Sequence, residues 1–155
     1  MRQAINIFLI LMVVFLQITL MPKIGIQYAY PNLILLAMLI LIFVGRESEA
    51  IWWAVLGGIF LDLVSPARFG VYIFSFIAIF FLASFAFKNL FAQPTLVMSA
   101  GIIYLSSLGL SLILSLFTWQ IHWQILIEAG YAVLIGVPLY WVTQHYLKPS
   151  EEIKV

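Results

Sequence analysis

Apolar residues continue through almost the whole of this chain, and only short polar segments such as Gly45–Glu49 and Lys148–Glu152 interrupt them. A soluble domain of this size needs polar surface to face water, but only 8% of these 155 residues are charged and 65% are hydrophobic. The pattern therefore predicts an all-α integral membrane protein, because a helix satisfies its own backbone hydrogen bonds in lipid.

The apolar segments predict one transmembrane domain over residues 1–155, since about 20 residues cross a bilayer as a helix. The expected spans form a compact six-helix bundle and cover residues 4–21, 28–44, 50–64, 69–87, 96–118 and 123–147. Pro31 falls near the first turn of the second span, where a missing N–H is harmless. The third helix is expected to be short, because about 15 residues reach only about 22 Å of a core about 30 Å thick.

Lysine and arginine residues in the loops predict the orientation, since basic residues gather on the cytoplasmic side of a membrane. We expect both termini in the cytoplasm, because that places most basic residues inside. Arg2, Arg46, Lys88, Lys148 and Lys154 then lie inside, and Lys23 and Arg68 lie outside. The net charge of +1 gives no field that would attract nucleic acid, so no nucleic-acid partner is expected.

One carboxylate, Asp62, lies inside the third apolar segment, where an ionised group is costly unless it has a partner. Ala54, Gly58 and Asp62 recur every four residues, so one helix face carries small residues that end in an acid. Such a face lets another helix approach closely, and the carboxylate then meets protein. The candidate partners are Arg68 and the backbone N–H groups at the start of the next helix near Gly70.

Glu128 is the second acid that the sequence places within the membrane, near the outer end of the last span. By topology, Asp62, Arg68 and Glu128 could share one polar cluster on the outer side. Three interpretations remain open for this cluster: a structural clamp on helix ends, a site for a substrate or proton, and a contact with a partner.

Small polar residues repeat every four positions along the fifth span, at Ser107, Ser111 and Ser115. Ala132 and Gly136 have the same spacing on the sixth span. Small residues at this spacing are typical of close helix contacts in membranes, so we expect packing within the bundle or against a partner helix.

Residues that carry catalysis do not form a recognisable pattern in this sequence. His122 and His145 lie near predicted span ends, with no second ligand at metal-binding spacing, and the chain has no cysteine. Phosphate-binding glycine loops and the motifs of serine and zinc hydrolases are also absent from the sequence. We therefore expect no catalytic, cofactor or metal site.

Two motifs resemble those of the rod-shape-determining MreD family. Pro31-Asn32-Leu33-Ile34-Leu35 is similar to the Pro-[Asp/Asn]-Leu-hydrophobic opening of the family's second span. Gly58, Asp62, Leu63, Ser65 and Gly70 match the spacing of its Gly-x-x-x-Asp-Leu-x-Ser-x-x-x-x-Gly signature. Length, the expected six-span layout and a cytoplasmic N-terminus agree with the same resemblance.

The resemblance implies a non-enzymatic scaffold in the bacterial inner membrane that supports lateral peptidoglycan synthesis and cell shape. It implies binding to the transmembrane helix of MreC, a bitopic periplasmic protein. Through MreC it implies contact with MreB and with the glycosyltransferase and transpeptidase that build the wall. The structural or partner-binding candidates are Pro31, Asn32, Gly58, Asp62, Ser65, Arg68, Gly70, Glu128, Ser107 and Ser111.

An alternative function belongs to a different class. Chains of this kind also resemble, in size and helix count, the substrate-capture subunits of energy-coupling-factor vitamin transporters. A small-molecule pocket beside Asp62, Arg68 and Glu128 is the feature that this alternative predicts.

Overall fold

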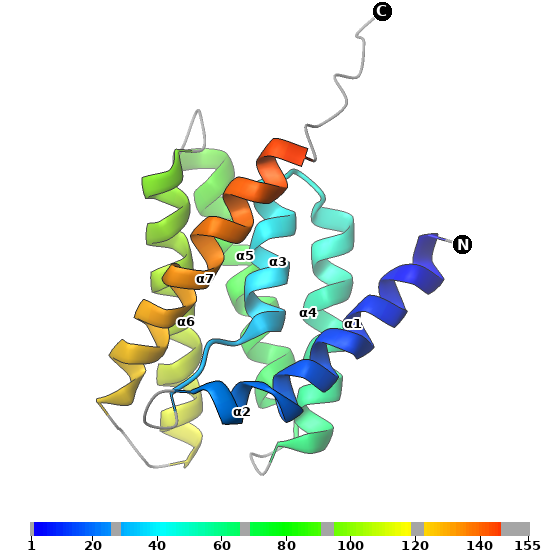
Figure 1. The fold of residues 1–155 in the computed structure, drawn as a ribbon, viewed down its shortest axis with the longest axis vertical. Helices are drawn as coiled ribbons and strands as arrows, with labels where there is room; N and C mark the ends of the chain where they lie inside the picture. Colours follow the sequence, from blue (N-terminus) through cyan, green and yellow to red (C-terminus); the bar gives the residue numbers. More distant parts are fainter. Residues whose placement is uncertain (1, 26–28, 66–68, 91–94, 119–122, 147–155) are drawn as a thin grey trace, which may run out of the picture.

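The computed structural model describes residues 2–25, 29–65, 69–90, 95–118 and 123–146. Within these ranges the chain is helical, as the sequence predicts, and Figure 1 shows the helices gathered side by side in one bundle. The helices are α1 (Arg2–Thr19), α2 (Met21–Ile24), α3 (Leu33–Phe43), α4 (Glu47–Val64), α5 (Val71–Leu90), α6 (Leu96–Thr118) and α7 (Gln124–Tyr146).

Helix α3 is the centre of the bundle and contacts α1, α4, α5, α6 and α7. Most of its side chains are buried, and its composition is apolar around the whole circumference. A helix of this kind needs protein on every side. Its 11 residues are too few to cross a bilayer alone, at about 1.5 Å per residue.

The start of α3 differs from the expected span at 28–44, because the helix begins only after Pro31. Pro31 therefore lies near the first turn, as expected, but outside the helix, two residues before Leu33. A proline disfavours the helical conformation in the residue before it, and here Asn32 caps the helix instead. Apart from the four-residue α2, α3 is thus the shortest of the described helices.

Helix α4 corrects the prediction of a short third helix. It begins at Glu47, three residues before the expected Ala50, and its 18 residues reach about 27 Å. Glu47 and Glu49 occupy its first turn, where acidic side chains interact favourably with the helix dipole. Glu49 also pairs with Arg46 at 2.5 Å. The last three residues of the polar segment Gly45–Glu49 therefore belong to the first turn of the helix.

The first predicted span, 4–21, corresponds to α1, and a second short helix that was not predicted, α2, follows it. Helix α1 ends at Thr19, and α2 contains Pro22 in its first turn. A proline ring clashes with the carbonyl group one turn earlier, which favours a kink or break in the helix at this point. Figure 1 shows α2 turned away from the axis of α1 toward the start of α3.

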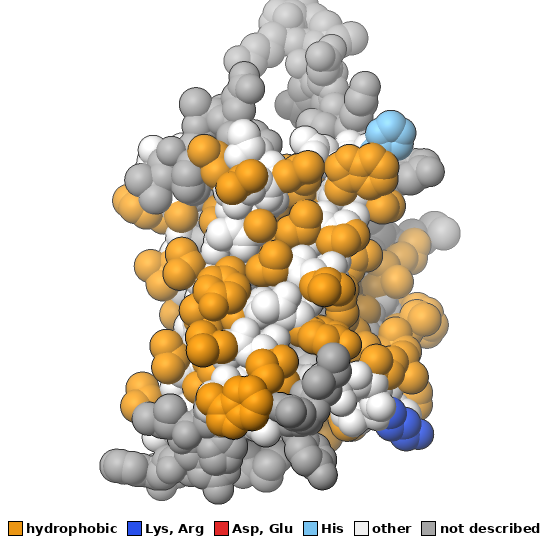
Figure 2. All heavy atoms as spheres, turned by 60° about the vertical axis from the view of Figure 1, so that its left-hand side comes forward, with side chains coloured by type: hydrophobic (Ala, Val, Ile, Leu, Met, Phe, Trp, Pro, Cys, Tyr) orange, Lys and Arg blue, Asp and Glu red, His pale blue; other side chains and the backbone are white. Residues whose placement is uncertain are grey.

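The last three helices lie close to their expected positions, and each is long and apolar enough to cross a membrane. These candidate spans are Val71–Asn89, Leu96–Phe117 and Gln124–His145 among the described residues. Figure 2 shows apolar side chains covering one face of the bundle, with the visible charged or imidazole groups near its two ends. The large exposed residues Leu105, Leu116 and Leu134 are suited to lipid contact.

Candidate functional site

Asp62 joins α4 to the start of α5 through hydrogen bonds to backbone groups. Its Oδ1 accepts from Tyr72 N at 2.9 Å, and its Oδ2 accepts from Ile73 N at 3.1 Å. The first N–H groups of a helix have no partner within the helix and carry partial positive charge. Asp62 is only 4% exposed, so the α5 terminus solvates this carboxylate in place of water. This is one of the two partners considered from the sequence.

Gly58 lies one turn before Asp62 and sets the distance between the same two helices. A Cβ atom added at Gly58 would lie 2.8 Å from Ile73 Cα and 3.1 Å from Ile73 N. Neither atom belongs to a side chain that can rotate away. The absence of a side chain at Gly58 therefore lets the α5 backbone come within reach of the Asp62 carboxylate.

Ser65 and Gly70 stand at the two sides of the loop between these helices. Ser65 is the C-terminal cap of α4, and its N–H donates to Leu61 O at 2.8 Å. Gly70 has a φ of 103°, which a residue with a side chain rarely adopts, and it directly precedes α5. Arg68, the other candidate partner of Asp62, lies outside the described residues. We call Gly58, Asp62, Ser65 and Gly70 the hairpin clamp.

Pro31 and Asn32 lie at the entrance to α3 and are fixed by a second group of hydrogen bonds. Asn32 Oδ1 accepts from Ile34 N and Leu35 N, each at 3.1 Å. Gln17 of α1 accepts from Leu33 N at 2.8 Å and donates through Nε2 to Pro31 O at 3.3 Å. Gln17 therefore ties α1 to α3, a role that its position in an apolar helix did not reveal.

Glu128 of α7 faces α6, where the serine stripe lies. Ser111 Oγ donates to Glu128 Oε2 at 2.6 Å, and Ser115 Oγ donates to Ser111 O at 2.7 Å. Ser107 is buried, and its Oγ has no hydrogen-bond partner among the described residues. Beyond this polar stretch, Gly136 lies close to Ile103 of α6, as a small residue at a helix contact should.

The two acids do not form one cluster among the described residues. Asp62 bonds to the start of α5, whereas Glu128 bonds to Ser111 of α6. Tyr72 is near both acids, since its N–H donates to Asp62 and the residue lines the same cavity as Glu128. Sequence reasoning did not select Tyr72, because an aromatic residue in an apolar segment carries no distinguishing signal.

Glu128 belongs to a polar cavity of about 320 Å³ enclosed by α1, α2, α4, α5, α6, α7 and the entrance to α3. Its polar lining comprises Gln17, Tyr30, Asn32, Ser65, Tyr72, Ser107, Ser111 and Glu128. We call this space the polar pocket. Among the candidates from the sequence, the structure places Pro31, Asn32, Ser65, Ser107, Ser111 and Glu128 around it.

A different, mainly apolar groove of about 340 Å³ lies between α1 and Leu139 of α7, with α3 as its floor, and Arg46, Glu49 and Trp53 line it at the start of α4. Leu9 and Val13 line the α1 side, Ala37 and Leu41 the floor, and Leu139 the α7 side. We call this space the lateral groove. Figure 1 shows α1 and α7 leaning in the same direction, with α3 and α4 visible between them.

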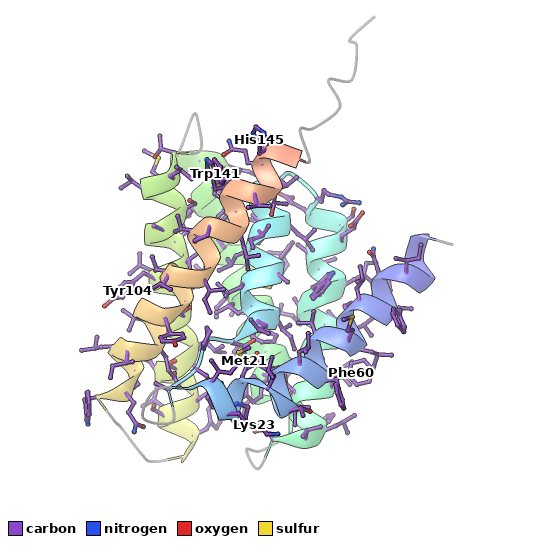
Figure 3. The ribbon with its side chains drawn as sticks, viewed as in Figure 1. Met21, Lys23, Phe60, Tyr104, Trp141 and His145 are labelled. Carbon is purple, nitrogen blue, oxygen red and sulfur yellow. The ribbon has the colours of Figure 1, made fainter. Side chains whose placement is uncertain are left out.

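Chemical groups typical of catalysis do not gather in the part of the chain that the structure describes. No group of three His, Cys, Asp or Glu side chains in this part is arranged to hold a metal ion. His145 stacks on Trp141 with ring centroids 6.0 Å apart, and both lie at the upper end of the bundle in Figure 3. His122 lies outside the described residues.

The fold and the hairpin clamp define a class: a small polytopic helical membrane protein whose motif residues hold helices together. A family model described as rod shape-determining protein MreD matches residues 1–147, so the chain belongs to this family and is a bacterial membrane protein with a role in rod shape determination. The resemblance stated from the motifs is confirmed. No curated protein and no solved structure matched the chain in the corresponding comparisons.

Proposed function

We propose that this chain is a non-enzymatic scaffold of the cell-elongation machinery, and that the lateral groove binds the transmembrane helix of MreC. Through MreC it would support lateral peptidoglycan synthesis together with MreB and the wall-building glycosyltransferase and transpeptidase. Family membership supports a role in the shape-determining system. The observation that carries the proposal is an apolar groove with a small residue, Ala37, on its floor.

The chemistry of the lateral groove suits a helix from another chain. Lipid gives little hydrophobic drive for helix association, so close packing against small residues and a few hydrogen bonds must supply the energy. Ala37 permits close approach, and Asn6 on the α1 side offers an amide that can bond to a helix in the groove. Leu9 and Leu139 are 41% and 45% exposed, so both sides of the groove are accessible.

We further propose that the bundle is a single domain with six spans and both termini in the cytoplasm. Helix α1 with α2 would form the first span, α3 a short second span shielded by the helices around it, and α4 to α7 the others. Arg46 and Lys88 precede α4 and end α5 at one end of the bundle, whereas Lys23 lies at the other end in Figure 3. This distribution supports a cytoplasmic upper end.

The orientation can be tested directly because the chain has no cysteine. A single cysteine replacing Lys23 should react with a membrane-impermeant maleimide added to whole spheroplasts. A cysteine replacing Lys88 should react only after the membrane is opened. The reverse labelling pattern would overturn the orientation.

Photocrosslinking in living cells tests the partner-binding face. A photoreactive residue at Leu9 or Leu139 should crosslink to MreC, whereas one at Leu105 should not. Leu105 is the matched control, because it is an exposed leucine of α6 that does not line the groove. Crosslinks to MreC from Leu105 alone, or equal yields at all three sites, would contradict the assignment of the groove.

The alternative of a vitamin-capture subunit receives no support from the comparisons, and its resemblance rests on size and helix count alone. Copurification separates the two functions. MreC without an ATPase would support the scaffold, and an ATPase partner with a bound vitamin would overturn it.

A further inference from the structure

The polar pocket contains a buried serine hydroxyl group, that of Ser107, in addition to its one described acid, Glu128. Ser107 is 6% exposed, lines the pocket, and has no partner for its hydroxyl group among the described residues. A buried hydroxyl without a hydrogen bond costs free energy, and it is rare in native proteins. Its position on the wall of a cavity means that a bound molecule can supply the missing hydrogen bond.

Glu128 gives the polar pocket its chemical character. Ser111 is its described hydrogen-bond donor, and the described Lys and Arg ion pairs are made elsewhere, by Arg46 with Glu49 and by Lys88 with Glu47. A carboxylate at this depth is costly without a positive or proton-donating partner. The pocket therefore favours a cation or a strong hydrogen-bond donor over an anion.

Aromatic and hydroxyl groups on the other walls favour the same kind of ligand. Tyr30 and Tyr72 line the pocket, and a tyrosine side chain can attract an organic cation through its ring face or accept a hydrogen bond through its phenolic oxygen. Ser65 adds a hydroxyl group at the end of α4. These groups can surround a small ammonium group with oxygen acceptors and aromatic faces.

One wall of the pocket is fixed before any ligand binds. The amide group of Gln17 is held by Leu33 and Pro31, and the side-chain oxygen of Asn32 is held by the start of α3. These two side chains are therefore held in place, whereas Glu128 and Ser107, which line the same pocket, carry the unused bonding capacity. A preformed cavity of about 320 Å³ lies at the small end of the range for ligand sites.

The edge of the pocket is apolar. Ile18 of α1 and Val64 of α4 both line it and are 39% and 56% exposed. An amphipathic molecule can keep an alkyl part against these residues while its polar end reaches Glu128. A highly polar solute gains nothing from such an edge.

We propose that the polar pocket binds an organic compound with a primary ammonium group, which contacts the Glu128 carboxylate while Ser107 bonds to a neighbouring polar atom of the ligand. The ammonium group belongs either to the headgroup of an ethanolamine phospholipid or to a free small amine. This site is separate from the lateral groove, and it requires neither MreC nor a transport partner. A failure of MreC crosslinking leaves it unaffected.

Thermal unfolding of the full chain, purified in detergent and depleted of lipid, tests the proposal. Phosphatidylethanolamine should raise the midpoint in a concentration-dependent manner, since a ligand that binds only the folded state stabilises it. Phosphatidylglycerol with the same acyl chains is the matched control and should have a smaller effect. Free ethanolamine separates the two sources: an equal shift with it identifies a small-amine site, and no shift identifies a lipid site.

Two variants connect the effect to the pocket. Glu128→Gln and Ser107→Ala should each weaken ethanolamine-lipid binding, by about tenfold for Glu128→Gln because a charge-assisted bond is lost. Ser84→Ala is the control, because Ser84 is a second buried serine without a partner that does not line the pocket. Equal stabilisation by the two lipids, or full retention of the effect in both pocket variants, would overturn the proposal.

Discussion

The two acids within the helices illustrate two ways of placing a carboxylate in a membrane protein. Asp62 uses both oxygens to bind the first N–H groups of α5 and is almost fully buried. Glu128 bonds to one serine and otherwise faces the polar pocket beside the unpartnered Ser107. In the first arrangement both carboxylate oxygens accept hydrogen bonds from the protein. In the second, one oxygen of Glu128 accepts from Ser111, and the hydroxyl group of Ser107 has no partner among the described residues. We therefore propose that Asp62 stabilises the fold, whereas Glu128 binds a ligand.

The largest effect on the hairpin clamp is expected for Gly58→Leu. The new side chain would meet the backbone of Ile73, so α5 must move away and the Asp62 hydrogen bonds must break. We expect a loss of about 3 kcal/mol or more in the free energy of unfolding, measured by thermal or chemical unfolding in detergent. Gly101→Leu is the control, since a Cβ atom at Gly101 meets nothing within 4 Å. An equal loss of unfolding free energy in both variants would contradict the claim that close contact at Gly58 stabilises the hairpin clamp.

A smaller loss is expected for Gly70→Ala, which leaves the cavity around Glu128 intact. The φ of 103° at Gly70 is strained for alanine, so the variant should lose about 1 to 3 kcal/mol. Gly130→Ala is the matched change near Glu128, where a Cβ atom meets nothing within 4 Å and alanine favours the helix. Unfolding midpoints should fall for Gly70→Ala and stay equal or rise for Gly130→Ala. A stable Gly70→Ala protein would show that the loop conformation is not required.

The smallest effect is expected for Ser107→Ala in the absence of ligand. The substitution removes a buried hydroxyl group that has no partner, so stability should be unchanged or increase by about 1 kcal/mol at most. The unfolding midpoint of lipid-depleted protein measures this directly. A loss of stability comparable to that of Gly70→Ala would mean that Ser107 supports the fold, and it would remove the contrast between the two regions.

Local spacing in the sequence predicted the hairpin clamp better than it predicted the pocket. Gly58 and Asp62 are one turn apart and precede a helix start, so a carboxylate bound to that start follows from helix geometry alone. Helix α3 starts later than the apolar pattern suggests, because Pro31 disfavours the helical conformation before it and Asn32 caps the helix. The spacing of apolar residues carries no information about these two effects. The α2 turn at Pro22 was missed for the same reason.

The polar pocket was beyond sequence reasoning because its lining comes from distant segments. Gln17, Tyr30, Tyr72 and Ser107 belong to different parts of the chain, and only the packing of the bundle brings them together. A serine on a small-residue stripe predicts helix contact equally well whether its hydroxyl group has a partner or not. The separation of Asp62 from Glu128 also depends on this packing. Topology alone placed both acids on the same side of the membrane and could not show that they bind different helices.

The most direct test of the division between the two acids compares Asp62→Asn with Glu128→Gln in lipid-depleted protein. Each variant removes one negative charge with little change in shape. Asp62→Asn should lose about 1.5 to 3 kcal/mol, because charge-assisted bonds to buried N–H groups are weakened. Glu128→Gln should unfold at nearly the wild-type midpoint. Equal destabilisation by the two variants, or a larger loss for Glu128→Gln, would contradict the account.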